Sequence, residues 1–242
     1  MKKNNKKTFS LLTVLLAVLA VCLLVVGGIG VTRAVLIESD TYSGTLETPD
    51  IAVQLNENGK AVSGEDALLQ DLLDGEESLA IGKHYDEVLT VTNTGTADQF
   101  VRVTLYKYWT DDEGKRVDLD TDYIGLVLGE DWLEDKSATT DERVVLYYPD
   151  KLSPDKGKNE TTPLLKEIYA DGDLALYVTE TTVTEGTHTT ITSTYKYNGL
   201  NLNLEASVDA IQTHHAQDAI EASWGTTNVK ADEDAGTLSV IN

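Results

Sequence analysis

The stretch Leu200-Asn201-Leu202-Asn203-Leu204-Glu205-Ala206-Ser207-Val208 alternates apolar and polar side chains over its whole length. Successive side chains of a β-strand point to opposite faces of the sheet, so a period of two is typical of a strand with one buried face. An amphipathic helix would instead place apolar residues three and four positions apart. The stretch therefore predicts a half-buried strand and indicates a β-rich fold.

Residues 99–109 repeat this pattern, with Val101, Val103 and Leu105 on one face. They follow the apolar run 88–92 after Asn93-Thr94-Gly95-Thr96, in which Asn and Gly tolerate the positive φ of tight turns. We expect the two runs to form either a hairpin or a corner between two sheets. Further strands are expected at residues 51–56, 143–148, 174–180, 191–197 and 237–241. Many short strands separated by turn signals predict an all-β, jelly-roll-like sandwich of two sheets.

Two segments have helical patterns instead. Ser63 and Asp66 resemble a capping box ahead of an apolar stripe that ends at Gly75 and consists of Leu68, Leu69, Leu72 and Leu73. Near the end of the chain Ala216, Ala219, Ile220 and Ser223 have helical spacing before Trp224, and Gly225 supplies a stop. A few short helices are therefore expected beside the sheets.

Residues 179–194 contain nine threonines in 16 positions and little to bury except Val183 and Ile191. Threonine favours strands, and Glu185-Gly186 suits a turn. The segment predicts a hairpin that projects from the body.

The first 34 residues have the pattern of a secretory signal peptide. Four lysines precede an apolar run over residues 11–26, and Thr32 and Ala34 suit the −3 and −1 positions of a cleavage site. We expect cleavage after Ala34, which leaves one domain over residues 35–242. The alternative is an uncleaved anchor over residues 9–31, a length that can cross a hydrocarbon core. Both readings place residues 35 onward outside the cytoplasm.

The chain is strongly acidic, with 41 acidic and 19 basic residues and a net charge of −22. Residues 1–34 hold five of the basic residues and no acid, so removing them gives −27. Such a charge excludes binding to nucleic acid, which needs clustered Lys and Arg. It also opposes self-association unless a directional contact overcomes the repulsion. The single cysteine, Cys22, excludes a disulfide within the chain.

Several short motifs occur in a fixed order along the chain. The leader holds Gly27-Gly28 and Thr32-Arg33-Ala34, followed by Ser39-Asp40; the body holds Val91-Thr92-Asn93-Thr94-Gly95-Thr96 leading to Phe100-Val101-Arg102-Val103, then Leu146-Tyr147-Tyr148, Ala210-Ile211-Gln212, Ala219 and Trp224-Gly225. In this order they resemble the TasA/camelysin family, proteins of Gram-positive bacteria that are exported by a SipW-type signal peptidase.

The resemblance implies a jelly-roll subunit of the biofilm matrix or cell surface. Its copies would join into fibres, the N-terminal strand of one completing a sheet of the next, and other matrix proteins would be further partners. The chain would contact the membrane only through its leader, before cleavage. The candidate donor strand contains Val35, Leu36, Ile37, Tyr42 and Leu46, and an open sheet edge can accept such a strand. Pairing of residues 35–48 within their own domain is the open alternative.

No catalytic constellation stands out. None of the four histidines, His84, His188, His214 and His215, forms the His-Glu-x-x-His zinc motif. Asp118, Asp120 and Asp122 alternate as in a calcium loop, but Tyr123 and Gly129 stand where the loop needs Gly and Glu, so a solvated acidic loop is expected. We expect neither an enzyme nor a cofactor. Two other classes stay open: a monomeric surface binding module that uses the threonine-rich hairpin or Trp109, Tyr147 and Tyr148, and, third, a camelysin-like metallopeptidase.

Overall fold

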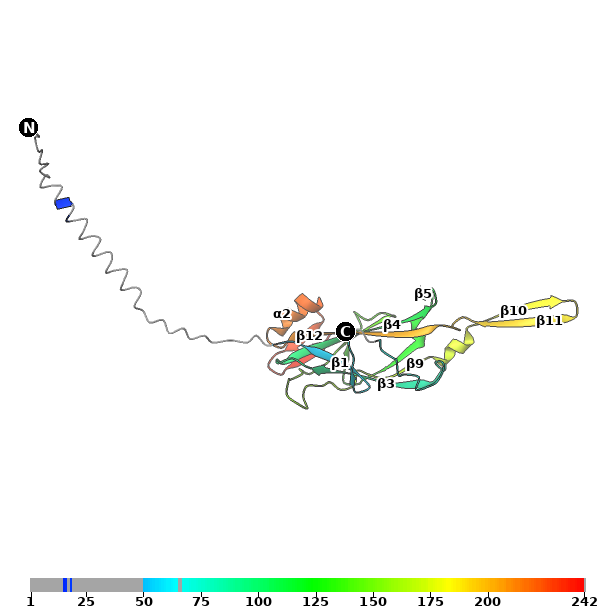
Figure 1. Cartoon of the computed structure of the whole chain (residues 1–242), viewed down its shortest axis with the longest axis horizontal. Helices are drawn as coiled ribbons and strands as arrows, with labels where there is room; N and C mark the ends of the chain where they lie inside the picture. Colours follow the sequence, from blue (N-terminus) through cyan, green and yellow to red (C-terminus); the bar gives the residue numbers. More distant parts are fainter. Residues whose placement is uncertain (1–14, 17, 19–49, 65–66, 242) are drawn as a thin grey trace, which may run out of the picture. The chain divides into compact units, whose positions relative to one another are not determined.

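The computed structural model describes residues 15–16, 18, 50–64 and 67–241. The chain divides into two compact units, Met1–Glu47 and Thr48–Asn242, and all the described strands belong to the second (Figure 1). Of the first unit, Leu15, Leu16 and Val18 are described, and their side chains are exposed. Within the described residues, no helix has the length and apolar character needed to span a membrane.

Two five-stranded antiparallel sheets form the body of the second unit. The first sheet has the order β2 (Lys60–Ala61), β1 (Val53–Glu57), β3 (His84–Asn93), β9 (Leu165–Ala170) and β6 (Ile124–Leu128). The second has the order β12 (Asn201–Gln212), β4 (Gln99–Asp111), β8 (Arg143–Tyr147) and β7 (Leu133–Glu134), with β5 (Gly114–Lys115) paired to β4.

The remaining described elements of the second unit are two small hairpins and four short helical segments. The hairpins are β10 (Val178–Glu185) with β11 (His188–Tyr195), and β13 (Val229–Asp232) with β14 (Thr237–Val240). The helical segments are η1 (Thr121–Tyr123), η2 (Gly172–Leu176), α2 (Ala216–Ala219) and η3 (Ile220–Trp224).

The main core lies between the two sheets. Val101, Val103 and Leu105 of β4 are fully buried, and they belong to one apolar cluster with Leu89 of β3 and Ile168 of β9. Each sheet thus turns the apolar half of its alternating strands toward the other, which defines a β-sandwich. The prediction of an all-β sandwich with a few short helices is confirmed.

Residues 93–98 form a corner between the sheets, since β3 and β4 belong to different sheets. The buried amide of Asn93 fixes it: Nδ2 donates to Ala97 O at 2.8 Å and to Leu152 O at 2.9 Å, and Oδ1 accepts from Gly95 N. A Cβ at Gly95 would lie 2.3 Å from Asp50 O, so only glycine fits there. Of the two arrangements expected for this turn, the corner is the one that forms.

A second apolar cluster covers the outer face of the sheet that contains β4. Phe100, Tyr147 and Ile211 of that sheet pack with Ile220 and Trp224 of the helical segment, and with residues of β13 and β14. Gly225 ends the helical segment at a φ of 67°, as predicted for residues 216–225. The C-terminal hairpin therefore forms part of a third layer of the unit.

Two sequence-based expectations are wrong. Residues 68–75 form turns rather than the predicted helix, because Leu69 and Asp74 have left-handed φ values of 68° and 41° that interrupt helical geometry. Asp66 of the expected capping box lies outside the described residues. Their leucines still pack against the main core. The strand expected over residues 174–180 starts only at Val178, since Leu174 is buried within η2.

The threonine-rich segment forms the predicted hairpin. β10 and β11 pair over eight residues each, from Val178 with Tyr195 to Glu185 with His188. Every side chain of both strands is exposed. Figure 1 shows the two strands extending beyond the sheets of the sandwich.

Candidate strand-acceptor groove

A groove of about 890 Å³ runs between β1 and β12. β12 is the edge strand of one sheet, and β1 is separated from the edge of the other only by the two-residue strand β2. The segment 62–69 and Tyr108 complete the lining. The groove therefore marks a side on which the sandwich is open.

Apolar side chains of both strands face this opening. Val53 and Leu55 of β1 and Leu202, Ala206 and Val208 of β12 line the groove, and all five are half-buried against the main core. An additional strand laid in the groove would cover this apolar surface, which favours binding by removing it from water.

The backbone edges beside the groove are largely unpaired. β12 pairs with β4 along all twelve of its residues, from Asn201 to Gln212, and no other described strand pairs with it. β2 covers β1 only at Asn56 and Glu57, and Val62 N donates one further hydrogen bond to Leu55 O at 2.9 Å. Such edges carry free N–H and C=O groups that an incoming strand can use.

Polar side chains hold the rim in place. The Gln54 amide nitrogen donates to Leu55 O at 2.8 Å and to Val62 O at 2.6 Å, which ties the segment after β2 to β1. On the other wall the Tyr108 hydroxyl donates to the Glu205 carboxylate, and this hydrogen bond raises the pKa of Tyr108. These groups shape the groove without closing it.

A pair of carboxyl groups fastens the segment around Leu69 to the end of β1. Glu87 is fully buried, on the part of β3 where the register with β9 shifts. Burial, together with the neighbouring Glu57, raises the pKa of Glu87 to about 8. Glu57 Oε1 in turn accepts from Leu69 N at 2.6 Å. Glu87 is therefore protonated at neutral pH and shares its proton with Glu57 beside the groove.

The buried surroundings of Glu87 fit the protonated form. The Asn58 amide nitrogen donates to Glu87 Oε2 at 3.2 Å. Glu87 Oε1 has no hydrogen-bond partner among the described residues, so nothing there offsets the cost of burying a negative charge, in agreement with the raised pKa.

The site residues named from the sequence lie outside the described residues. These are the cleavage residues Thr32 and Ala34 and the candidate donor residues Val35, Leu36, Ile37, Tyr42 and Leu46. Sequence reasoning identified the strand 200–208 but not the groove beside it. A period of two reveals which face of a strand is buried, whereas it carries no information on whether a neighbouring strand exists.

The histidines are spread over separate parts of the unit. His84 Nδ1 lies 2.7 Å from Glu167 Oε2, and its ring stacks on Tyr169 with centroids 4.0 Å apart. His188 lies at the start of β11, and His214 and His215 precede α2. Within the described part of the chain, no group of three or more His, Cys, Asp or Glu residues is arranged to hold a metal ion.

Two of the three aspartates of the expected acidic loop have structural partners. The Arg116 guanidinium donates to both carboxylate oxygens of Asp118 at 2.8 and 2.9 Å, and this ion pair lowers the pKa of Asp118. Asp120 Oδ1 accepts from Asp122 N at 2.9 Å and caps η1.

The aromatic residues considered for a binding surface are not on exposed loops. Trp109 and Tyr147 are buried, with 3% and 1% of their surface exposed. Tyr148 is half-buried and packs against Trp132. Trp109 and Tyr147 therefore cannot serve as exposed recognition residues, because their apolar area is used in the two cores.

No protein-family model, curated protein or solved structure matches the chain. The fold itself defines the class: an antiparallel two-sheet β-sandwich. One of its sides is open between two strands near the sheet edges.

Proposed function

We propose that this chain is an exported, non-enzymatic structural protein of the extracellular matrix or cell surface. Its copies join by donor-strand exchange, in which residues 35–48 of one copy enter the groove between β1 and β12 of the next. The observation that carries the proposal is the coincidence of half-buried apolar side chains and unpaired strand edges in one groove.

The chemistry of the proposed donor suits this groove. Residues 35–48 contain Val35, Leu36, Ile37, Tyr42 and Leu46, which supply β-forming and apolar side chains. Hydrogen bonds along the edge would give affinity, and the apolar side chains would give register. The resemblance of the motif order to the TasA/camelysin family supports the same arrangement, including export by a SipW-type peptidase.

The net charge explains why a directional contact is required. Copies with a charge of −22, or −27 without the leader, repel one another at neutral pH. A ladder of backbone hydrogen bonds is local and is weakened little by this repulsion. Lower pH or divalent cations reduce the repulsion and should favour assembly.

A monomeric surface binding module is the second candidate. The exposed hairpin of β10 and β11 favours it, whereas Trp109 and Tyr147, two of the aromatic residues considered for its surface, are buried.

The test compares residues 35–242 with residues 47–242 by negative-stain electron microscopy, at neutral pH, at low pH and with millimolar Ca²⁺. We expect filaments from the longer form alone. A synthetic peptide of residues 35–48 should bind the shorter form with a stoichiometry of one and raise its melting temperature, whereas a scrambled peptide should not.

Two variants of the longer form distinguish blockage of the groove from a general destabilisation of β12. Ala206→Arg places a charge among the apolar residues of the groove, and Ser207→Arg places the same charge at the exposed neighbouring position. Filaments should be lost only with Ala206→Arg. Single particles under every condition, with the longer form more stable in urea than the shorter, would instead mean that residues 35–48 pair within their own domain.

A further inference from the structure

We infer that the outer edge of β11 is a second self-association surface, on which two copies pair their β11 strands antiparallel to make a four-stranded sheet. The inference is independent of the donor strand, since it concerns residues 188–195 and needs nothing from residues 35–48.

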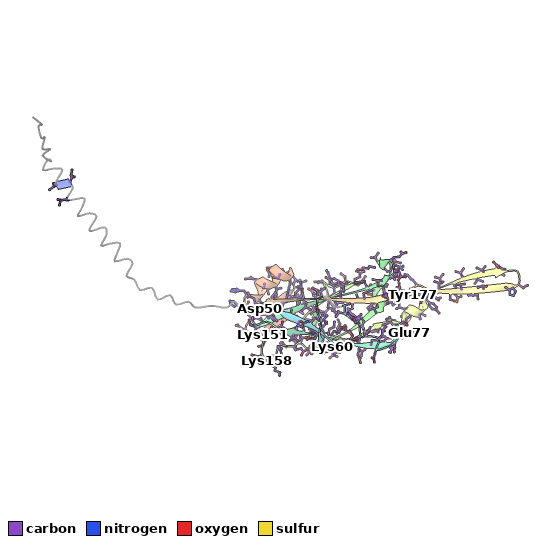
Figure 2. The ribbon with its side chains drawn as sticks, in the orientation of Figure 1. Asp50, Lys60, Glu77, Lys151, Lys158 and Tyr177 are labelled. Carbon is purple, nitrogen blue, oxygen red and sulfur yellow. The ribbon has the colours of Figure 1, made fainter. Side chains whose placement is uncertain are left out.

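The hairpin is held firmly at its root. The ring of Tyr177 lies edge-on to Tyr123 and Tyr197, with centroids 5.3 and 5.8 Å away, and Tyr197 contacts the buried Trp109 at 5.6 Å. The hydroxyl groups of Tyr123 and Tyr177 are also hydrogen-bonded to each other. Figure 2 shows Tyr177 where the hairpin leaves the body. An anchored root presents the two strands in a defined direction.

Beyond the root, the apolar side chains of the hairpin are largely exposed to solvent. Ile191, Val183 and Tyr195 are 62%, 51% and 50% exposed. A two-stranded hairpin without further packing is only marginally stable in water. Pairing with additional strands would supply both hydrogen bonds and apolar contacts.

The outward-facing backbone groups of β11 follow from the register. Lys196 N donates to Tyr177 O at 2.9 Å, so this pair is hydrogen-bonded. Hydrogen-bonded and non-hydrogen-bonded pairs alternate along an antiparallel ladder. The next hydrogen-bonded pairs toward the tip of the hairpin are therefore Thr179 with Thr194 and Thr181 with Thr192. The N–H and C=O groups of Thr189, Ile191 and Ser193 therefore point away from β10, and no other described strand pairs with them. Tyr195 O also points outward but accepts a hydrogen bond from Asn198 N at 3.3 Å.

The distribution of carboxylates favours β11 over β10 as the pairing edge, and it favours a second copy of the chain as the partner. β11 contains no carboxylate, whereas β10 carries Glu180 and Glu185. On a chain with a net charge of −22, an eight-residue edge free of acids is a place where two copies can approach with little repulsion. Two β10 strands would instead bring glutamates together.

The composition of β11 also favours pairing with another strand. Natural proteins protect exposed edges with Lys, Pro or bulges, and β11 contains neither Lys nor Pro and pairs with β10 without a register shift. Two identical strands that pair antiparallel are related by a two-fold axis, so each copy satisfies the same groups of the other.

The test uses residues 47–242, which contain all residues of both apolar cores and lack the proposed donor strand. Sedimentation equilibrium should detect a dimer. Thr192→Glu should weaken dimerisation about tenfold or more, because it places like charges close together near the centre of the new pairing. Thr181→Glu is the matched control: Thr181 and Thr192 are directly paired in the hairpin and both exposed, and its effect should stay below about twofold.

Cross-linking provides a second measurement that does not depend on a charged variant. Residues 47–242 contain no cysteine, so Ile191→Cys and its paired control Thr182→Cys each introduce a single thiol. A short bis-maleimide should join two copies of Ile191→Cys and leave Thr182→Cys largely monomeric. A monomer at every concentration, or equal effects of the two members of each pair, would overturn the inference. Filaments of residues 35–242 that survive Thr192→Glu would leave the donor-strand proposal intact.

Discussion

Replacing Glu87 with glutamine should remove a pH dependence of folding stability that originates beside the groove. Glutamine is almost isosteric with a protonated glutamate, and its amide can donate to Glu57 and accept from Asn58 as the carboxyl group does. The substitution therefore keeps the buried hydrogen bonds while making the position neutral at every pH.

The size of the effect follows from the pKa. The pKa of Glu87 is about 8, against 4.5 for an ordinary glutamate, and each pKa unit corresponds to about 1.4 kcal/mol. Between these two values the unfolded chain binds fewer protons than the folded one, so the free energy of unfolding falls as pH rises. The contribution of Glu87 is complete below pH 4.5 and is lost by about pH 8, a change of about 5 kcal/mol at most.

Urea denaturation of residues 35–242 and of the Glu87→Gln variant at pH 5, 7 and 9 measures this difference. The variant should have wild-type stability near pH 5 and exceed it by several kcal/mol at pH 9. Both proteins share the general repulsion of an acidic chain, which cancels in the comparison. Glu77→Gln, at an exposed carboxylate, is the control and should follow the wild type. Parallel pH profiles for the wild type and Glu87→Gln would refute the assignment of a buried proton to this pair.

Three further substitutions test the packing of the sandwich. Ile168→Ala, at a fully buried position of the main core, should lower the free energy of unfolding by about 2–5 kcal/mol in urea. Gly125→Ala should cost about 1–3 kcal/mol, because its Cβ would lie 2.0 Å from the Tyr169 ring; adding Tyr169→Ala should remove most of that penalty, and additive losses in this double-mutant cycle would contradict the clash. Arg102→Lys should cost about 1–2 kcal/mol in the same assay, since the guanidinium donates to both Asp209 and the Trp224 carbonyl oxygen; an unchanged midpoint would show that this link to the third layer is dispensable.

Alternation of polar and apolar residues predicted the strands that follow a simple period. The pattern at 200–208 became β12, and the threonine-rich segment became a hairpin. The start of β3 was missed because its buried face includes Tyr85 and the protonated Glu87, which no hydrophobic pattern marks as an inward position. Whether a glutamate side chain faces the core depends on its tertiary surroundings, which the local sequence does not specify.

The strands β6 and β9 were not predicted because of irregularities in their pairing with each other. β6 carries Gly125 in its interior, a residue that weakens a strand pattern and is required here by the overlying Tyr169 ring. The pairing of β6 with β9 also shifts register between Val127 and Leu128, so side-chain alternation is interrupted. The groove itself depends on which strands have neighbours, and that is decided by the topology of the whole chain.

The pairing of β12 with β4 also sets the order in which the groove can arise. The two strands are far apart in the sequence, yet they are paired along the whole of β12. Contacts of such wide sequence separation form late and slow the folding of β-rich domains. A growing chain that has produced β1 still lacks the opposite wall until residues 201–212 follow. Residues 35–48 are thus synthesised long before their own copy has a complete groove, whereas copies that have already folded have one.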